Sequence, residues 1–106
     1  KTFTPPASVR NAALRGLDWR RQYGRGGTSI GVARARDLSN GRAVSIRTLK
    51  RMRAYFDRHV IDSWTVGWFK DEPGFPSAGR IAWELWGGDA GRKWAESKLN
   101  QLENEL

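Results

Sequence analysis

Four basic side chains recur at helical spacing near the middle of the chain, namely Arg47, Lys50, Arg51 and Arg58. With Arg47 at 0° on a helical wheel, the other three fall at about 300°, 40° and 20°. Four apolar residues fall between about 140° and 260° on the same wheel, namely Leu49, Phe56, Met52 and Ile46. Like charges at this spacing repel each other by a few tenths of a kcal/mol per close pair. Because a polyanion would relieve that repulsion, we predict that this face contacts nucleic-acid phosphates, the alternative being a solvated helix face.

A glycine-rich turn offers a second phosphate site, at Arg25, Gly26, Gly27 and Thr28. Its small residues leave backbone N–H groups uncovered where the next helix should start, and the helix dipole favours an anion there. Arg25 adds a positive charge. The run matches neither a Walker A motif nor a dinucleotide fingerprint. We therefore predict contact with one phosphate, the alternative being a plain turn between two helices.

Positive charge is concentrated in the first part of the chain. The net charge is +8, but residues 1–60 hold 14 Lys/Arg against 3 Asp/Glu, whereas residues 61–106 hold 5 against 8. Twelve of those 14 bases are Arg, the side chain whose planar fork suits phosphate. Arg34 and Arg42 are expected to extend the basic surface, as is Arg36, although some of the three would only solvate their helix.

Residues suited to catalysis or to metal binding are sparse. The chain has no Cys and a single His, and His59 falls near the expected end of a helix, where a cation is favoured. Asp71 and Glu72 share a proline-rich loop, and no HExxH or triad pattern is present. We predict a non-catalytic module with no metal and no cofactor.

One helical domain is expected to position these residues. Pro5 and Pro6 resist a helix, so residues 1–7 predict an extended arm, and residues 8–106 predict an all-α fold, a single compact bundle of about five helices. The expected helices are 9–23 after a Ser8 N-cap, 29–40 after Thr28 or Ser29, 46–59 after Ser45, 78–86 after Ser77, and 90 onwards after Asp89. Residues 60–76 predict a long aromatic-rich loop, with or without a short hairpin.

Six tryptophans predict core filling, because each buries about 150–250 Å². They cluster in the acidic half, away from the arginines, which favours a duplex-backbone binder over a single-strand binder that stacks bases. No segment is rich in Asn or Gln for reading base edges. We therefore predict binding of double-stranded DNA without strong sequence preference, at about four to six phosphates and with a log–log salt slope of roughly −4 to −5.

Two alternatives to duplex binding stay open. RNA binding is one. The other is a phage assembly or protein–protein interaction module, which the aromatic loop and a stripe of Leu99, Leu102 and Leu106 with Ala95 would favour. We expect a monomer. The sequence has no run of 18 or more apolar residues, so we expect no contact with a membrane.

Several motifs form a specific combination over roughly residues 9–95. They are Arg15-Gly16-Leu17, Trp19-Arg20, Tyr23-Gly24-Arg25-Gly26-Gly27-Thr28, Gly31-Val32-Ala33-Arg34-Ala35, Tyr55-Phe56-x-Arg58-His59 and Pro76-Ser77-Ala78-Gly79-Arg80-Ile81-Ala82-Trp83-x-Leu85-Trp86-Gly87-Gly88-Asp89-Ala90-Gly91. The combination resembles a small helical DNA-binding module that recurs in bacteriophage-encoded proteins, beside head-maturation proteases and as an N-terminal accessory domain of some ATP-dependent DNA ligases.

This resemblance implies an auxiliary role on DNA, in replication or repair, in the cytoplasm of a bacterial or phage-infected cell. It also implies a catalytic domain in the same chain as a partner, such as that of a DNA ligase. No Lys-x-Asp-Gly motif of a ligase is present, and the chain starts without Met. We therefore expect this sequence to be a piece of a longer protein.

Overall fold

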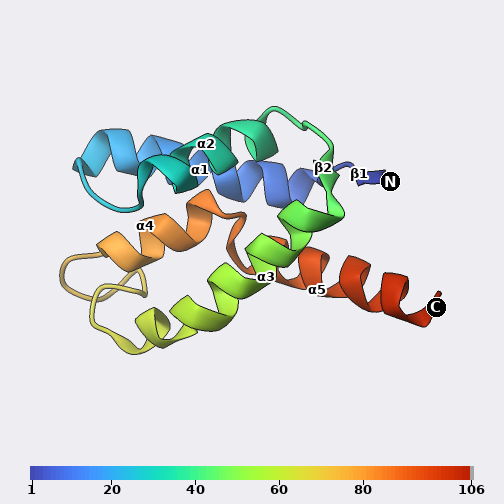
Figure 1. Ribbon diagram of the computed structural model, residues 1–106. Coiled ribbons are helices and arrows are strands. Elements are labelled where there is room, and N and C mark those ends of the chain that lie inside the picture. The colour runs from blue at the N-terminus through green and yellow to red at the C-terminus, as the bar shows by residue number, and fades with distance from the viewer. Residues whose placement is uncertain (106) are drawn as a thin grey trace.

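Five α-helices make up most of the computed structural model, which describes residues 1–105 (Figure 1). They are α1 (Ala7–Tyr23), α2 (Ser29–Ser39), α3 (Ile46–His59), α4 (Ala78–Leu85) and α5 (Gly88–Asn104), and a 3-10 helix, η1 (Val60–Trp64), follows α3. The predicted all-α bundle is confirmed. No helix among the described residues is both long enough and apolar enough to cross a membrane.

Side-chain caps fix the starts of α2, α3 and α4 where the sequence predicts them. In each, a hydroxyl oxygen accepts a hydrogen bond from the backbone N–H three residues further on, at 3.3 Å for Thr28 and Gly31, 3.2 Å for Ser45 and Thr48, and 3.0 Å for Ser77 and Arg80. Each cap satisfies one N–H group that the first turn of a helix leaves without a partner.

The predicted caps of the other two helices are wrong. Ser8 lies inside α1, because the carbonyl of Pro6 already accepts the N–H groups of Val9 and Arg10 and so starts the helix earlier. Asp89 lies in the first turn of α5, which starts after Gly87 at a φ of 112°. The Asp89 carboxylate instead accepts a hydrogen bond from the indole N–H of Trp83 at 2.9 Å.

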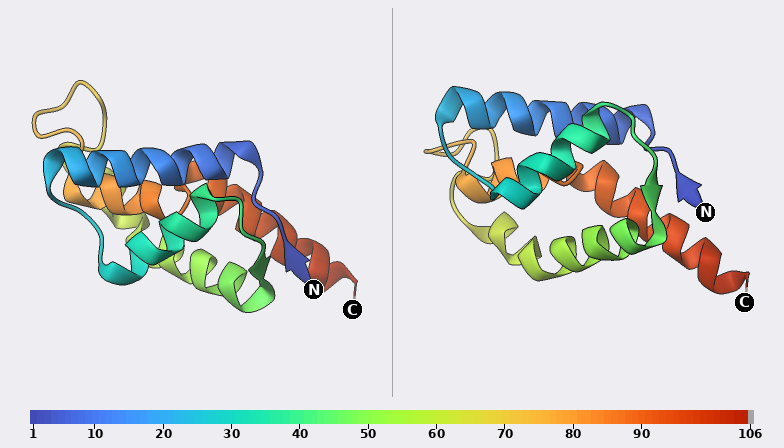
Figure 2. Two further views of the ribbon diagram at one scale, coloured as in Figure 1. Left: turned by 90° about the horizontal axis from the view of Figure 1, so that it is seen from above. Right: turned by 45° about the horizontal axis from the view of Figure 1, so that its top comes forward.

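The N-terminal arm is extended, and it also pairs with a distant segment. Strand β1 (Thr2–Phe3) runs antiparallel to strand β2 (Val44–Ser45), directly before α3. Figure 2 shows both chain ends at the same end of the molecule, and Lys1 Nζ lies 3.5 Å from Glu105 Oε1. This small sheet was not predicted from the sequence, because its two strands lie about 40 residues apart and neither has a pattern of its own.

The predicted loop, residues 60–76, begins with η1 and continues toward α4 as a series of turns. No strand lies within these residues, so the alternative of a short hairpin is wrong. The Ser77 N–H donates to the Gly67 carbonyl at 2.9 Å and closes the loop. Trp68 is buried, and Phe75 meets Trp19 edge-to-face at 5.4 Å. These aromatic contacts hold the predicted aromatic-rich loop against the bundle.

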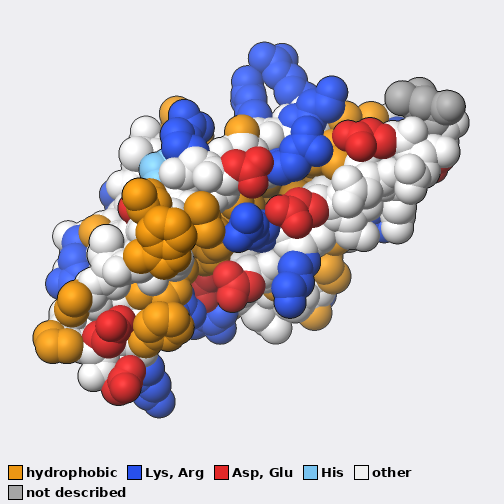
Figure 3. Space-filling view, turned by 90° about the horizontal axis from the view of Figure 1, so that it is seen from below, with side chains coloured by type: hydrophobic (Ala, Val, Ile, Leu, Met, Phe, Trp, Pro, Cys, Tyr) orange, Lys and Arg blue, Asp and Glu red, His pale blue; other side chains and the backbone are white. Residues whose placement is uncertain are grey.

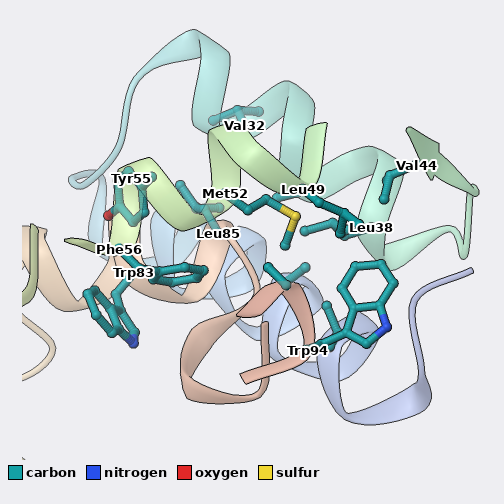
Figure 4. Close-up of a cluster of buried hydrophobic side chains, with 14 of the residues drawn as sticks. Val32, Leu38, Val44, Leu49, Met52, Tyr55, Phe56, Trp83, Leu85 and Trp94 are labelled. Carbon is teal, nitrogen blue, oxygen red and sulfur yellow. The ribbon is translucent and has the colours of Figure 1, made fainter. Parts of the chain in front are cut away.

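The core lies between α1, α3 and the α4–α5 corner. In Figure 1, α1 and α2 form the upper layer and α3 crosses α5 below them, and α1 packs against α2, α4 and α5. Gly16 permits a close crossing of α1 and α4, since an added Cβ would lie 2.6 Å from the backbone nitrogen of Leu85. Figure 4 shows Leu49, Met52 and Phe56 of α3 inside this core.

Core filling holds for only part of the predicted apolar set. Trp68, Trp83 and Trp94 are buried, whereas Trp64 is 78 % exposed. Leu99 is buried and Leu102 packs against the core. The remaining member of the predicted leucine stripe, Leu106, lies outside the described residues.

Candidate nucleic-acid interface

Helix α3 presents four exposed cations, which are those predicted from the sequence: Arg47, Lys50, Arg51 and Arg58. The Ser45 cap and the apolar face fix the rotation of the helix, because Leu49, Met52 and Phe56 must turn inward. Among residues 1–105, none of the four cations forms an ion pair with a carboxylate. Their charges are therefore available to a partner.

The packing of α3 separates these cations into two groups. Arg51 and Arg58 line a groove between α2, α3 and α4. Lys50 lies on the other flank, in a smaller groove beside Leu99 and Leu102 of α5. Arg47 lies one turn before Arg51 on the same side of the helix. We call Arg47, Arg51 and Arg58 the basic stripe.

A view from the α3 side shows how charge is distributed on the surface (Figure 3). Lys and Arg side chains gather and project along the upper edge, whereas Asp and Glu alternate with Lys and Arg across the face toward the viewer. Ion pairs of α5 include Arg92 with Glu96 at 3.3 Å, and Glu103 with Arg53 of α3 at 3.9 Å. Positive charge is thus concentrated rather than spread evenly over this side of the molecule.

The groove beside the stripe has a volume of about 690 Å³. Volumes of about 300–1,000 Å³ are typical of small-molecule sites. Arg34 of α2 faces Arg51 and Arg58 of α3 across it, and its apolar wall includes Ile30 and Trp86. One guanidinium group of α2 and two of α3 therefore share one concave surface.

Arg34 is the most enclosed of these three cations, with a side chain only 15 % exposed. Its Nη1 lies 3.9 Å from the Asp37 carboxylate, its guanidinium lies 5.7 Å from the centre of the Trp86 ring, and its buried Nε has no hydrogen-bond partner. Burial lowers the pKa of Arg34, Asp37 opposes that shift, and the charge of Arg51 adds to it. Arg34 and Arg51 line the same groove, which brings these two like charges near each other.

Tyr55 forms the floor between two other rings. It stacks on His59 at 4.5 Å and on Trp86 at 4.6 Å, with a 9° angle to the latter. Its hydroxyl is buried without a partner, and burial, with a smaller contribution from Asp62, raises the pKa of Tyr55, so the hydroxyl remains a proton donor. Figure 4 shows that hydroxyl turned away from Met52.

Two residues of the groove, Tyr55 and Trp86, were not predicted from the sequence. A signal for Tyr55 was present, since it falls at about 80° on the helical wheel, between the basic and the apolar face. Residues at such a border contact whichever element packs beside the helix. No comparable signal marks Trp86, which lies just beyond the end of α4.

The glycine-rich turn divides into two parts. The Arg25 guanidinium donates to the carbonyls of Pro76 at 3.0 Å and Gly74 at 3.2 Å, so it fastens the turn to the aromatic loop and does not join the groove. Gly26, at a φ of 94°, lies against Ile81 and Ala78 of α4. Gly27 and Thr28 do line the groove, at the start of α2.

Arg42 also has a local partner. Its Nη1 lies 3.6 Å from Asp37, the carboxylate that Arg34 approaches from the other oxygen. The Arg42 side chain remains 75 % exposed. It lies at the margin of the candidate interface rather than in the groove.

The predicted separation of tryptophans from arginines is wrong in three dimensions. Arg34 lies 5.7 Å from the ring centre of Trp86, and Arg80 lies 5.3 Å from that of Trp68. The rings in the groove nevertheless offer little room for stacking bases, since Tyr55 is covered by another ring on each face.

The described residues contain no group of three or more His, Asp or Glu side chains suited to a metal ion. His59 lies near the end of α3 with its Nδ1 3.2 Å from Asp62 Oδ2. No family model, curated protein or solved structure matches this chain.

Proposed function

We propose that this domain binds double-stranded DNA through its sugar–phosphate backbone, without strong sequence preference. The observation that carries the proposal is the basic stripe, three exposed guanidinium groups on one side of α3 that no carboxylate among residues 1–105 neutralises. A rigid helix holds these groups in a row, and guanidinium is the side-chain group best suited to phosphate oxygens.

The dimensions of the stripe suit a duplex. Arg47 and Arg58 are 11 positions apart, which places them about 16 Å apart along a helix axis. That length corresponds to about five nucleotides along one strand of DNA. Contact with about four to six phosphates is consistent with this length if Arg42, at the margin of the interface, also contributes.

The domain would serve a larger DNA-processing protein, as its resemblance to phage-encoded modules and to accessory domains of DNA ligases implies. By holding the duplex, it would raise the local concentration of DNA for a catalytic domain in the same chain. No catalytic role is proposed for the domain itself.

The test compares two triple variants that lose the same charge. R47A/R51A/R58A removes the basic stripe, and K70A/K93A/K98A removes three cations of the loop and α5. At about 0.5–1 kcal/mol per lost phosphate contact, the stripe variant should bind duplex DNA roughly 10- to 100-fold more weakly, and equally so for unrelated sequences. The control variant should stay within about threefold of the wild type.

Equal weakening in both variants would mean that only net charge matters and would refute the proposed surface. Competition with single-stranded DNA and with structured RNA belongs in the same experiment. If the domain bound either competitor more tightly than the duplex, that competitor would be the ligand and the proposal of duplex DNA would be wrong.

A second candidate function rests on an exposed apolar patch near η1. Ile61, Trp64, Val66 and Phe69 are 56, 78, 69 and 58 % exposed. Such a cluster is typical of a protein-binding site. A Trp64→Ser variant should keep its affinity for DNA. If the patch binds a protein, the wild type should associate with that protein in the presence of nuclease and high salt, and Trp64→Ser should abolish the association.

A further inference from the structure

The groove between α2, α3 and α4 contains more hydrogen-bonding capacity than the protein itself uses. Arg34 and Tyr55 line it, and Arg34 Nε and the Tyr55 hydroxyl are closed off from solvent without a hydrogen-bond partner among residues 1–105. Tyr55 as a whole is only 7 % exposed. Buried polar groups are almost always hydrogen-bonded, so two donors without partners on residues of one groove point to an acceptor that reaches them when these side chains shift.

Charge identifies the kind of acceptor. Three cations, Arg34, Arg51 and Arg58, line the groove together with one carboxylate, Asp62, whose Oδ2 lies 3.2 Å from His59 Nδ1. Asp37 lies outside the lining, 3.9 Å from Arg34. A concave site with a surplus of guanidinium groups focuses positive potential. The start of α2, with Thr28 on the groove wall, adds the positive end of a helix dipole. The matching ligand is a compact anion with several acceptor oxygens.

Charge and shape decide between the two phosphates that DNA offers. An internal phosphodiester carries one negative charge and continues into a sugar on each side, so it balances less of the positive charge of the three guanidinium groups. A strand-terminal monoester carries about −1.5 to −2 charges near neutral pH and is attached on one side only. A volume of about 690 Å³ can admit a terminal nucleotide, and Ile30, Ala82 and Trp86 supply an apolar wall for its base.

We infer that this groove binds the terminal phosphate monoester of a DNA strand, with Arg34, Arg51 and Arg58 as its ligands. The inference rests on the proposed function, because the basic stripe brings the duplex to the groove. Arg51 and Arg58 belong to both sites. Arg34 belongs to the groove alone and therefore distinguishes the two.

The experiment measures affinity for three forms of one short duplex: a dumbbell closed by hairpins at both ends, an open duplex with 5′-hydroxyl ends, and an open duplex with 5′-phosphate ends. The wild type should bind the phosphorylated duplex about tenfold more tightly than the hydroxylated one. Arg34→Gln should remove that preference and leave dumbbell binding within about twofold.

Arg42→Gln is the matched control, since Arg42 approaches the same Asp37 carboxylate from outside the groove. It should retain the preference. Competition with inorganic phosphate and with deoxyadenosine monophosphate shows which part of the strand end the groove recognises. If both competitors remove the preference, the groove recognises the phosphate group alone. If only the nucleotide removes it, the groove recognises the terminal nucleotide as well as its phosphate.

Equal affinity of the wild type for phosphorylated and hydroxylated ends, with dumbbell binding intact, would overturn the inference and leave the proposed function in place. A preference for phosphate that persists in Arg34→Gln would likewise overturn the assignment to this groove. Failure to bind the dumbbell while phosphorylated ends still bind through Arg34 would overturn the proposed function instead.

Discussion

Two sets of arginines in this domain differ in what surrounds them. On the α1–α4 side, the carboxylate of buried Glu84 accepts two hydrogen bonds from Arg15, at 2.8 and 3.1 Å, and lies 3.6 Å from Arg80 Nη2. Arg80 also donates to the Trp68 carbonyl at 2.8 Å. On α3, the guanidinium groups of the basic stripe have no carboxylate partner among residues 1–105. The same residue type thus stabilises the fold in one region and is left free in the other.

Burial of the carboxylate explains the difference. Glu84 is 2 % exposed, and a buried carboxylate must be paired and hydrogen-bonded. Its two arginines are therefore part of the packing between α1 and α4. No buried acid faces the basic stripe, so nothing inside the protein requires its charges. An arginine surface becomes informative about binding only after the arginines that serve the fold have been set aside.

The largest expected effect concerns the paired region. Glu84→Gln preserves volume but leaves two guanidinium groups without their counter-charge. Breaking a buried pair costs about 3–5 kcal/mol, and because Arg15 is 47 % exposed and can be hydrated, we expect a loss of about 2–4 kcal/mol. Denaturant unfolding measures it. Glu96→Gln, which breaks a half-exposed pair with Arg92, should cost less than about 1 kcal/mol, and equal losses would contradict the special role of Glu84.

Gly16→Ala tests the same region without changing charge. The new methyl group would meet backbone atoms of Glu84 and Leu85 at 2.6–3.0 Å. Overpacking of this kind costs about 1–3 kcal/mol. A lower melting temperature with unchanged affinity for DNA is expected, when binding is measured well below the transition. A variant as stable as the wild type would show that α1 and α4 can move apart freely.

A comparison on α3 itself sharpens the definition of the stripe. Arg51 lines the groove, whereas the neighbouring Lys50 faces α5. Arg51→Ala should therefore weaken duplex binding about two- to fivefold, or about 0.5–1 kcal/mol, and Lys50→Ala less than that. Fluorescence anisotropy titrations at one salt concentration can resolve this. Equal losses would show that the DNA covers both flanks of α3.

The smallest expected effect is on the stability of the stripe variants. Arg47→Gln removes a charge that lies one turn from Arg51 and pairs with no acid among residues 1–105. Since like charges at this spacing repel by a few tenths of a kcal/mol, the free energy of unfolding should stay the same or rise by that amount. A loss above about 1 kcal/mol would mean that Arg47 serves the fold, as Arg15 does.

The sequence alone predicted much of the local structure. The limits of α3, Ile46–His59, were predicted without error, because a hydroxyl cap precedes a segment with separate basic and apolar faces. The start of α5 was not, because Asp89 is a good N-cap by type, yet the buried Trp83 indole recruits its carboxylate. A contact between two side chains of the tertiary structure overrode a local preference.

The candidate site was less predictable than the helices. Every cation of the groove was named from the sequence, but nothing local could show that Arg34 of α2 would face Arg51 and Arg58 of α3. Arg25 was predicted to bind a phosphate, but its guanidinium instead donates to carbonyls of a loop about 50 residues away. Helix boundaries follow from neighbours in the chain, whereas the partner of an arginine depends on packing between distant segments.

The salt dependence of duplex binding tests the central claim most directly, because it counts phosphate contacts. The wild type should give a log–log slope of roughly −4 to −5, and R47A/R51A/R58A a slope less steep by about 2.7, at about 0.9 per lost contact. K70A/K93A/K98A should keep the wild-type slope. An unchanged slope in the stripe variant would show that these three arginines do not contact the DNA backbone.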